Sequence, residues 1–191
     1  MERGYEKIFW GLLISIFDIN LGPINILPDF IGYFILGSGI YKLYEEFVCK
    51  EFKIANSLAN FLMVYSLFMS VLDYGFSSNL IGTDMNSNPI KQIIDMGLAI
   101  FVSSIILIMA FNIISGTISL YKEREQNTEA NDLVKTQRNY TVMYIIGLML
   151  EGIFLNISNG YFGTAIALYL LIITLYFAKI VSNIRKTINV I

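Results

Sequence analysis

Five acidic side chains fall within stretches of otherwise apolar sequence, where a carboxylate is costly and therefore informative. They belong to the 15 Asp and Glu residues of a 191-residue chain that has no His and one Cys. Each lies toward the same end of a different predicted helix. Carboxylates clustered in a low dielectric repel one another, so they stay protonated or recruit a cation. The five acids are Asp18, Asp29, Asp73, Asp95 and Glu151.

Two of these acids lie near the starts of predicted helices. Asp29 directly follows Pro28, and Asp95 lies a turn and a half of helix beyond Pro89. The positive end of a helix dipole stabilises a nearby carboxylate by about 0.3–1 kcal/mol. Capping therefore explains Asp29 without any function. Asp95 lies deep for that explanation, so a structural and a functional role both stay open.

The other three acids lie toward the ends of predicted helices, where the negative end of the dipole disfavours a carboxylate. Asp73 precedes a Tyr-Gly pair, and simple contact with water is an alternative for it. Asp18 ends a short segment, whereas Glu151 lies well inside its segment, between Gly147 and Gly152. A surface position explains Glu151 least well.

Together these residues predict an outward-facing acidic recess that binds a metal ion, a proton or a cationic solute. Oxygen ligands suit hard cations such as Mg²⁺ and Ca²⁺, and the absence of His disfavours zinc. The identity of a metal stays open, and no cofactor is expected. The candidate residues are Asp18, Asn25, Asp29, Asp73, Asp95 and Glu151.

Six apolar segments must position these side chains. The chain is 55% hydrophobic and 15% charged, against about 25% charged residues in ordinary soluble domains. A spanning helix needs about 20 mostly apolar residues, and residues 105–114 lack the alternation of a barrel strand. We expect an all-α polytopic membrane protein, one domain over residues 1–191. Its six transmembrane helices form three helical hairpins, from residues 8–20, 28–44, 54–74, 90–120, 140–157 and 161–182.

The basic residues predict the orientation of these helices. Of the 13 Lys and Arg residues, only Lys91 falls on the side opposite the others. Cytoplasmic loops carry the excess of Lys and Arg in membrane proteins. We therefore expect both termini, and the loops after the second and fourth helices, to lie in the cytoplasm.

The first hairpin is short for two crossings. Residues 8–44 must supply both helices and a turn, which need about 40 residues. Gly22, Pro23 and Pro28 interrupt helical structure between them. In one interpretation the connection dips below the outer membrane surface, covered by protein. In the other, the first helix extends through residues 2–7 at its cytoplasmic end and an ordinary surface turn follows.

This hairpin resembles the N-terminal hairpin of small, uncharacterised multi-pass membrane proteins of Gram-positive bacteria. The resemblance rests on the run FDINLGPINILPDFIGYFILGSGI, and above all on the Leu-Pro-Asp-Phe-Ile-Gly-Tyr element at residues 27–33. It does not extend past the second predicted helix. It implies a location in a bacterial plasma membrane and implies no activity.

The remaining features rank the classes of function. A net charge of −2 supplies no basic field, so no nucleic-acid partner is expected. Without His there is no Ser/His or Cys/His pair, so an enzyme is the least favoured class.

Binding or transport of a small solute or cation through the recess ranks first. The size and six-helix topology resemble the substrate-capture subunits of energy-coupling-factor transporters, without a shared motif. The alternative is a non-transporting interaction or assembly protein, such as a sensor partner or an immunity-type factor. It would use the charged stretch 121–139. The expected partners are the lipid bilayer and, as a second candidate, another membrane subunit.

Overall fold

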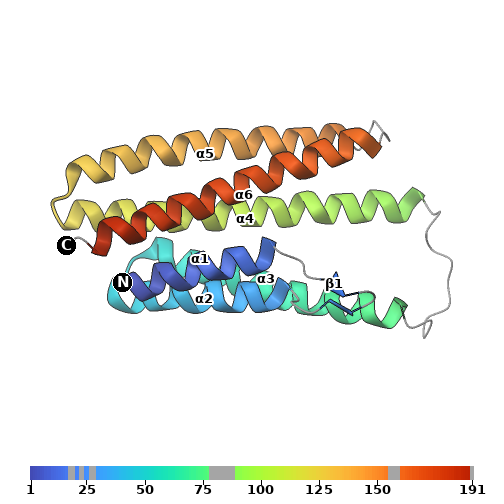
Figure 1. The fold of residues 1–191 in the computed structure, drawn as a ribbon, viewed down its shortest axis with the longest axis horizontal. Coiled ribbons are helices and arrows are strands. Elements are labelled where there is room, and N and C mark those ends of the chain that lie inside the picture. The colour runs from blue at the N-terminus through green and yellow to red at the C-terminus, as the bar shows by residue number, and fades with distance from the viewer. Residues whose placement is uncertain (17–19, 22–23, 26–28, 78–88, 155–159, 190–191) are drawn as a thin grey trace.

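The chain folds into a bundle of long helices (Figure 1). The computed structural model describes residues 1–16, 20–21, 24–25, 29–77, 89–154 and 160–189. Over these residues the all-α prediction is confirmed, apart from one short pair of strands. The helices are α1 (Glu2–Ile16), α2 (Asp29–Glu46), α3 (Lys50–Ser77), α4 (Pro89–Glu123), α5 (Asn127–Phe154) and α6 (Gly160–Asn189).

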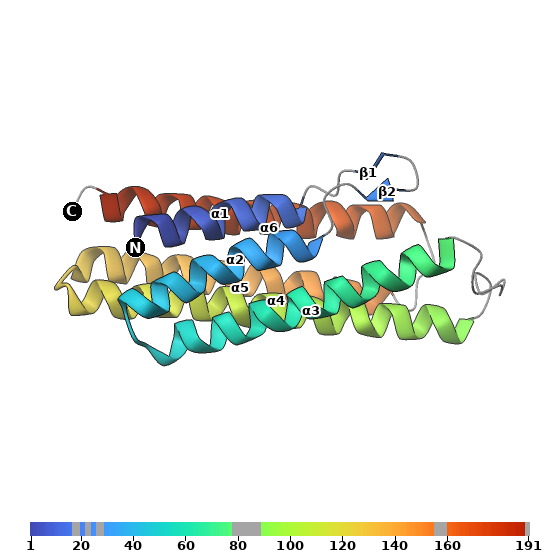
Figure 2. The same cartoon turned by 90° about the horizontal axis from the view of Figure 1, so that it is seen from below.

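The helices form a closed ring in sequence order. Each helix packs against the next one along the chain, and α6 packs against α1. Successive helices run in opposite directions, so the predicted hairpins α1–α2, α3–α4 and α5–α6 are all present (Figure 1). Figure 2 shows the same bundle from below.

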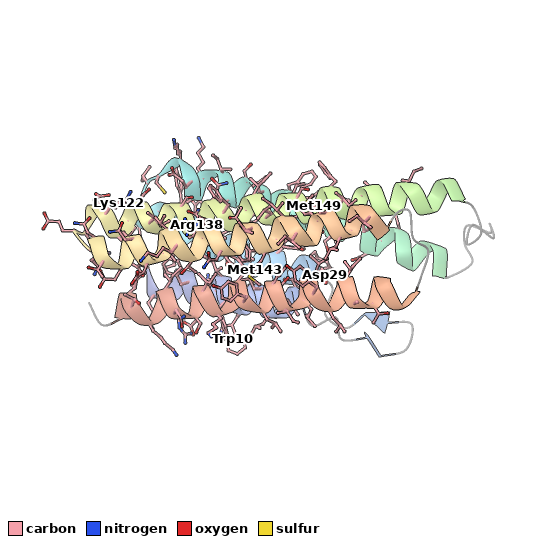
Figure 3. The ribbon with its side chains drawn as sticks, turned by 90° about the horizontal axis from the view of Figure 1, so that it is seen from above. Trp10, Asp29, Lys122, Arg138, Met143 and Met149 are labelled. Carbon is pink, nitrogen blue, oxygen red and sulfur yellow. The ribbon has the colours of Figure 1, made fainter. Side chains whose placement is uncertain are left out.

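The two ends of the bundle differ in charge. Both chain ends, the α2–α3 link and the α4–α5 turn lie at one end (Figure 1), which we call the basic end. Every Lys and Arg whose side chain is described belongs to the half of the bundle nearest this end. Figure 3 labels Lys122 and Arg138 toward it, with Asp29 and Met149 nearer the opposite end. We call that opposite end the far end.

Glycines bring α1 and α2 into backbone contact. A Cβ atom at Gly11 would lie 2.5 Å from the backbone nitrogen of Leu36 and 2.7 Å from the carbonyl oxygen of Gly32. One at Gly39 would lie 2.6 Å from the carbonyl oxygen of Gly4. These glycines recur at a spacing of seven along each helix, so they form one face. Small residues permit this close approach of helices in lipid.

The basic half of the bundle has a filled core. The Tyr5 side chain of α1 is 0% exposed, and its hydroxyl lies 2.8 Å from Thr117 Oγ1 of α4. The Thr117 hydroxyl donates to the carbonyl oxygen of Ile113, so Tyr5 is the donor to Thr117. Phe52 of α3 packs on Gly116 of α4, where a Cβ atom would lie 2.8 Å from its ring. Side chains from three helices thus meet inside this half.

The first hairpin combines features of both interpretations offered by the sequence. α1 begins at Glu2, so the helix does extend at the basic end. It was expected to end at Asn20, but that residue lies in β1 (Asn20–Leu21), which pairs antiparallel with β2 (Ile24–Asn25). Along the bundle axis the two strands lie before the far ends of α3 and α4 (Figure 2). Irregular backbone therefore lies within the length of the bundle.

Three helices are long and apolar enough to cross a membrane among the residues that the structure describes. The segments are Lys50–Leu72, Gly97–Glu123 and Gly163–Ile188. Helix α1 is too short at 15 residues, and α2 has 18 residues that include several charges. The first half of α5 is polar. By length and composition, the structure thus supports three of the six expected spans.

Large apolar side chains cover the outside of the bundle. Met149 is 64% exposed and Ile172 is 59% exposed, and similar side chains line α3 and α4. Exposed apolar surface of this extent marks a membrane or protein contact. We call this surface the exposed apolar belt. It includes α5, where the exposed residues recur with helical spacing: Val142, Ile145, Ile146, Met149 and Ile153.

Candidate functional site

Glu151 faces the interior of the bundle. It lies nine residues after the exposed Val142, and at about 100° per residue this places it roughly half a turn around the helix. Gly147 of α5 lies on this inner side as well, because a Cβ atom there would lie 2.8 Å from Leu170 of α6. Glu151 is therefore the acid that α5 turns away from its apolar outer face.

Hydrogen bonds satisfy only part of the Glu151 carboxyl group. The Ser103 hydroxyl of α4 donates to Glu151 Oε1 over 3.4 Å. Ser103 is also hydrogen-bonded to the hydroxyl of Tyr144, which lies two turns before Glu151 on α5. Glu151 Oε2 is buried and has no hydrogen-bond partner within the described part of the chain. A buried oxygen without a partner is costly, so this one calls for an explanation.

A cavity of about 250 Å³ opens beside this carboxyl group, between α4, α5 and α6. Its α6 wall comes from Gly163, Ile166, Ala167 and Leu170, which share one helix face by their spacing. The exposed Leu168 and Ile172 lie on other sides of α6. The other described lining residues are Ala99, Ile100 and Glu151. The cavity therefore lies between α4, α5 and α6 and opens to the surface of the bundle, since Ala99 and Ala167 in its walls are exposed. Glu151 is the one acidic residue among its described walls.

The bundle closes below this cavity toward the basic end. Leu170 packs on Gly147, and the Tyr169 hydroxyl of α6 donates to the carbonyl oxygen of Met143 over 3.0 Å. Deeper in the same interface, the rings of Tyr140 and Phe177 lie 5.3 Å apart between their centroids. The cavity thus has a floor made by the contact of α5 and α6.

Two tyrosines connect Asp29 to the same region. Tyr33 follows Asp29 by one turn on α2, and the two side chains are close enough for the Asp29 charge to act on the Tyr33 hydroxyl. Tyr144 lies similarly close to both Tyr33 and Glu151. Asp29 lies one turn beyond Tyr33 toward the far end, and Glu151 lies two turns beyond Tyr144 in that direction. Both acids are therefore on the far-end side of the tyrosine pair.

The sequence analysis missed Ser103, Tyr33 and Tyr144 as members of the site. Ser103 lies four residues after Ala99, a spacing of small residues that by itself indicates only close helix packing. Tyr144 lies seven residues before Glu151, which puts both on one face of a helix. That spacing is the signal that could have identified Tyr144. Tyr33 lies four residues after Asp29 on the same helix face, and this spacing is the corresponding signal for it.

The remaining predicted site residues are only partly placed. Asp18 lies outside the described residues. Asn25 lies in β2, Asp73 in α3 and Asp95 in α4, but the side chains of these three are not among those described. Among the described residues, no group of three His, Cys, Asp or Glu side chains could hold a metal ion. The metal-binding form of the acidic recess is therefore not assembled in the part of the chain that is placed.

Asp29 occupies the place that capping predicts. It is the first residue of α2 and the acidic residue of its first turn. The dipole of α2 therefore stabilises its carboxylate. Of the two candidates whose side chains are described, Asp29 and Glu151, only Glu151 has a position that calls for a ligand.

A second cavity, of about 240 Å³, lies at the basic end between α4, α5 and α6. Its walls include the acids Glu129 and Asp132 together with Tyr121 and Thr187. The Lys135 ammonium lies 3.5 Å from the Asp132 carboxylate, but both side chains are about 70% exposed. Exposed ion pairs of this kind contribute little stability.

Comparison with known proteins adds no family to these observations. No protein-family model matches the chain, and neither a curated protein nor a solved structure matches it.

Proposed function

We propose that this chain is a six-span membrane protein that binds or transports a small cationic solute through a recess at its far end. The observation that carries the proposal is Oε2 of Glu151, which is buried and has no hydrogen-bond partner among the described residues, beside the cavity between α4, α5 and α6. No described basic side chain lies in this half of the bundle to neutralise it. In this proposal a mobile cation supplies the positive charge, since an unpaired buried carboxylate otherwise stays protonated.

The closed ring of helices supports six crossings. Helices α1, α2 and α5 pack directly between or beside the three apolar helices, in one continuous ring. The exposed apolar belt continues across α5, although the first half of that helix is polar. A single bilayer covering this belt would enclose all six helices. For the first hairpin, the crossing would then be completed by the segment that contains β1 and β2.

The charge distribution supports one orientation. The basic end carries the Lys and Arg residues, which are enriched on the cytoplasmic side of membrane proteins. Both termini would then be cytoplasmic, and the recess would open outward. A bacterial plasma membrane is proposed from the resemblance of residues 27–33. An epitope tag after α6 should react with antibody only in permeabilised cells, and labelling of intact cells would reverse the orientation.

The recess would act through its low dielectric. Ser103, itself hydrogen-bonded to Tyr144, would hold Oε1 of the Glu151 carboxyl group and leave Oε2 for the solute. Attraction between the carboxylate and a cation is stronger there than in water. The filled core of the basic half would keep the pathway closed on the cytoplasmic side, as an outward-facing binding state requires.

A thermal-shift experiment tests this function. The purified protein in detergent is heated with Na⁺, K⁺, Mg²⁺, Ca²⁺ or a small alkylammonium ion, and compared with Glu151→Gln and with the double variant that adds Asp18→Asn. At least one cation should stabilise the native chain in a saturable way, and the variants should lose this effect. Glu123→Gln, at an exposed site on α4, is the control and should behave as the native protein. Equal shifts in every variant would contradict the proposal.

The second cavity favours one alternative, a membrane interaction or assembly protein. Its two acids lie at the start of α5, within the charged stretch 121–139, and would receive a basic segment of a partner. Charge reversal at Glu129 would then abolish binding of the basic partner segment, while leaving the cation-dependent thermal shift of the protein intact. Loss of the thermal shift alone, through Glu151→Gln, would favour the recess instead.

A further inference from the structure

We propose that the recess selects a compact primary alkylammonium ion, with its ammonium group on Glu151 and its alkyl group in the cavity. This inference rests on the proposed function and specifies the class of its solute. It concerns the walls of the cavity rather than the carboxylate alone.

The walls are unsuited to an inorganic cation. Ca²⁺ takes six to eight oxygen ligands and Mg²⁺ takes six. Apart from Glu151, the described lining residues are Ala99, Ile100, Gly163, Ile166, Ala167 and Leu170, none of which has a side-chain oxygen. The Ser103 hydroxyl already donates to Glu151 Oε1. Against these described walls, a metal ion would keep nearly its whole hydration shell.

The same walls suit an alkyl group. Burial of apolar carbon against the aliphatic side chains of Ile100, Ile166 and Leu170 is favourable because it removes carbon from water. The ammonium group has three N–H donors, and Glu151 Oε2 is a buried acceptor that no described residue hydrogen-bonds. One carboxylate therefore satisfies the charge, and the apolar walls supply the rest of the binding energy.

Two further features restrict the solute to a small primary amine. The volume of about 250 Å³ lies just below the range of about 300–1,000 Å³ for drug-sized ligands. The alkyl group is therefore short, with one branch at most. Quaternary ammonium ions are recognised chiefly by aromatic faces, and the described walls contain no aromatic ring. A cation that donates hydrogen bonds is thus favoured over one that cannot.

Isobutylammonium chloride is the probe that tests this inference. Its stabilisation of the purified protein is compared with that by NaCl, MgCl₂ and tetramethylammonium chloride at matched ionic strength, and with the neutral analogue isobutanol. Burial of the alkyl carbons should lower the half-saturating concentration at least about tenfold relative to Na⁺. Isobutanol and tetramethylammonium should give much smaller shifts.

Two variants distinguish the contribution of the carboxylate to binding from the contribution of the cavity walls. Glu151→Gln should abolish the shift with isobutylammonium, whereas Ala99→Leu, which fills the cavity and keeps the carboxylate, should weaken isobutylammonium more than Na⁺. Ala99 is exposed, so a larger side chain can be accommodated there. Should Glu151→Gln fail to fold, the native protein and Ala99→Leu still decide the outcome. Glu123→Gln again serves as the matched control.

The outcomes distinguish this inference from the function on which it rests. If Na⁺ or Mg²⁺ stabilises the protein through Glu151 at concentrations equal to or below those of isobutylammonium, the alkylammonium inference is overturned and the cation-binding function stands. If isobutanol matches isobutylammonium, the carboxylate plays no part and the inference fails. If no cation gives a shift that depends on Glu151, both fail.

Discussion

The two halves of this bundle use small residues in opposite ways. In the basic half, Gly4, Gly11, Gly32 and Gly39 bring α1 and α2 into backbone contact and leave no space. In the far half, Ala99, Gly163 and Ala167 line a cavity of about 250 Å³. Helix α1 ends at Ile16 and covers only part of the length of α6 (Figure 1). A small residue therefore permits close helix packing only where another helix lies against it. Where no helix lies against it, the small side chain leaves a cavity.

The largest expected effect comes from filling the contact in the basic half. The variant Gly11→Leu forces atoms into the backbone of α2, which cannot move as a flexible side chain would. We expect a loss of at least about 3 kcal/mol in the free energy of unfolding and little folded protein after detergent extraction. Yield and monodispersity in size-exclusion chromatography measure this. Gly97→Leu is the matched control, because a Cβ atom at Gly97 meets nothing within 4 Å.

A folded, stable Gly11→Leu protein would contradict this contrast between the two halves, because α1 and α2 would then have to move apart without loss of stability.

The next effect comes from the buried hydrogen bond between α1 and α4. Thr117→Val leaves the Tyr5 hydroxyl as a buried donor without its acceptor, which costs about 1–3 kcal/mol. The double variant Tyr5→Phe with Thr117→Val should lose less than the sum of the single variants, because it removes both partners. Thermal unfolding in detergent measures the three values. Additive losses would show that this contact does not couple the helices.

In the far half, a substitution should raise the free energy of unfolding rather than lower it. Glu151→Met replaces a carboxyl group that has an unpartnered oxygen with an apolar side chain of similar volume. Removing a buried oxygen without a described partner relieves its desolvation cost, whereas the Ser103 hydroxyl loses its acceptor, so we expect a change between zero and a stabilisation of about 1 kcal/mol. Unfolding without added cation measures it, with the exposed Glu123→Met as the control. Strong destabilisation would mean that Glu151 serves the fold rather than a solute.

The smallest effect concerns Cys49 in the α2–α3 link. Burial raises the pKa of this thiol, and the thiolate is the reactive form. At pH 7.5 iodoacetamide should alkylate Cys49 more slowly in the folded protein than in the unfolded one. The part of this difference that comes from ionisation should disappear as the pH rises above the pKa of the folded state. Mass spectrometry follows the reaction, and equal rates at pH 7.5 would show that the link is not packed.

Composition and periodicity determined most of the fold. Apolar segments separated by polar links predicted six helices in three hairpins, because each segment must satisfy its own backbone in an apolar setting. The gathering of Lys and Arg in alternate links predicted that those links meet at one end, as Figure 1 shows. The boundary of the first helix was less predictable, since Gly22 and Pro23 signal an interruption and not the strand pair that flanks them.

The site depended on information that no local pattern carries. Sequence identified Glu151 as an anomalous acid, because its type conflicts with its apolar surroundings. Only the tertiary structure decided that α4 supplies Ser103 to one of its oxygens, that no described group reaches the other, and that small residues of α4 and α6 leave a space beside it. The physical reason is that the spacing of apolar residues along a helix specifies which of its faces avoid water. Which of those faces meet, and which remain uncovered, depends on the relative lengths of helices far apart in the chain.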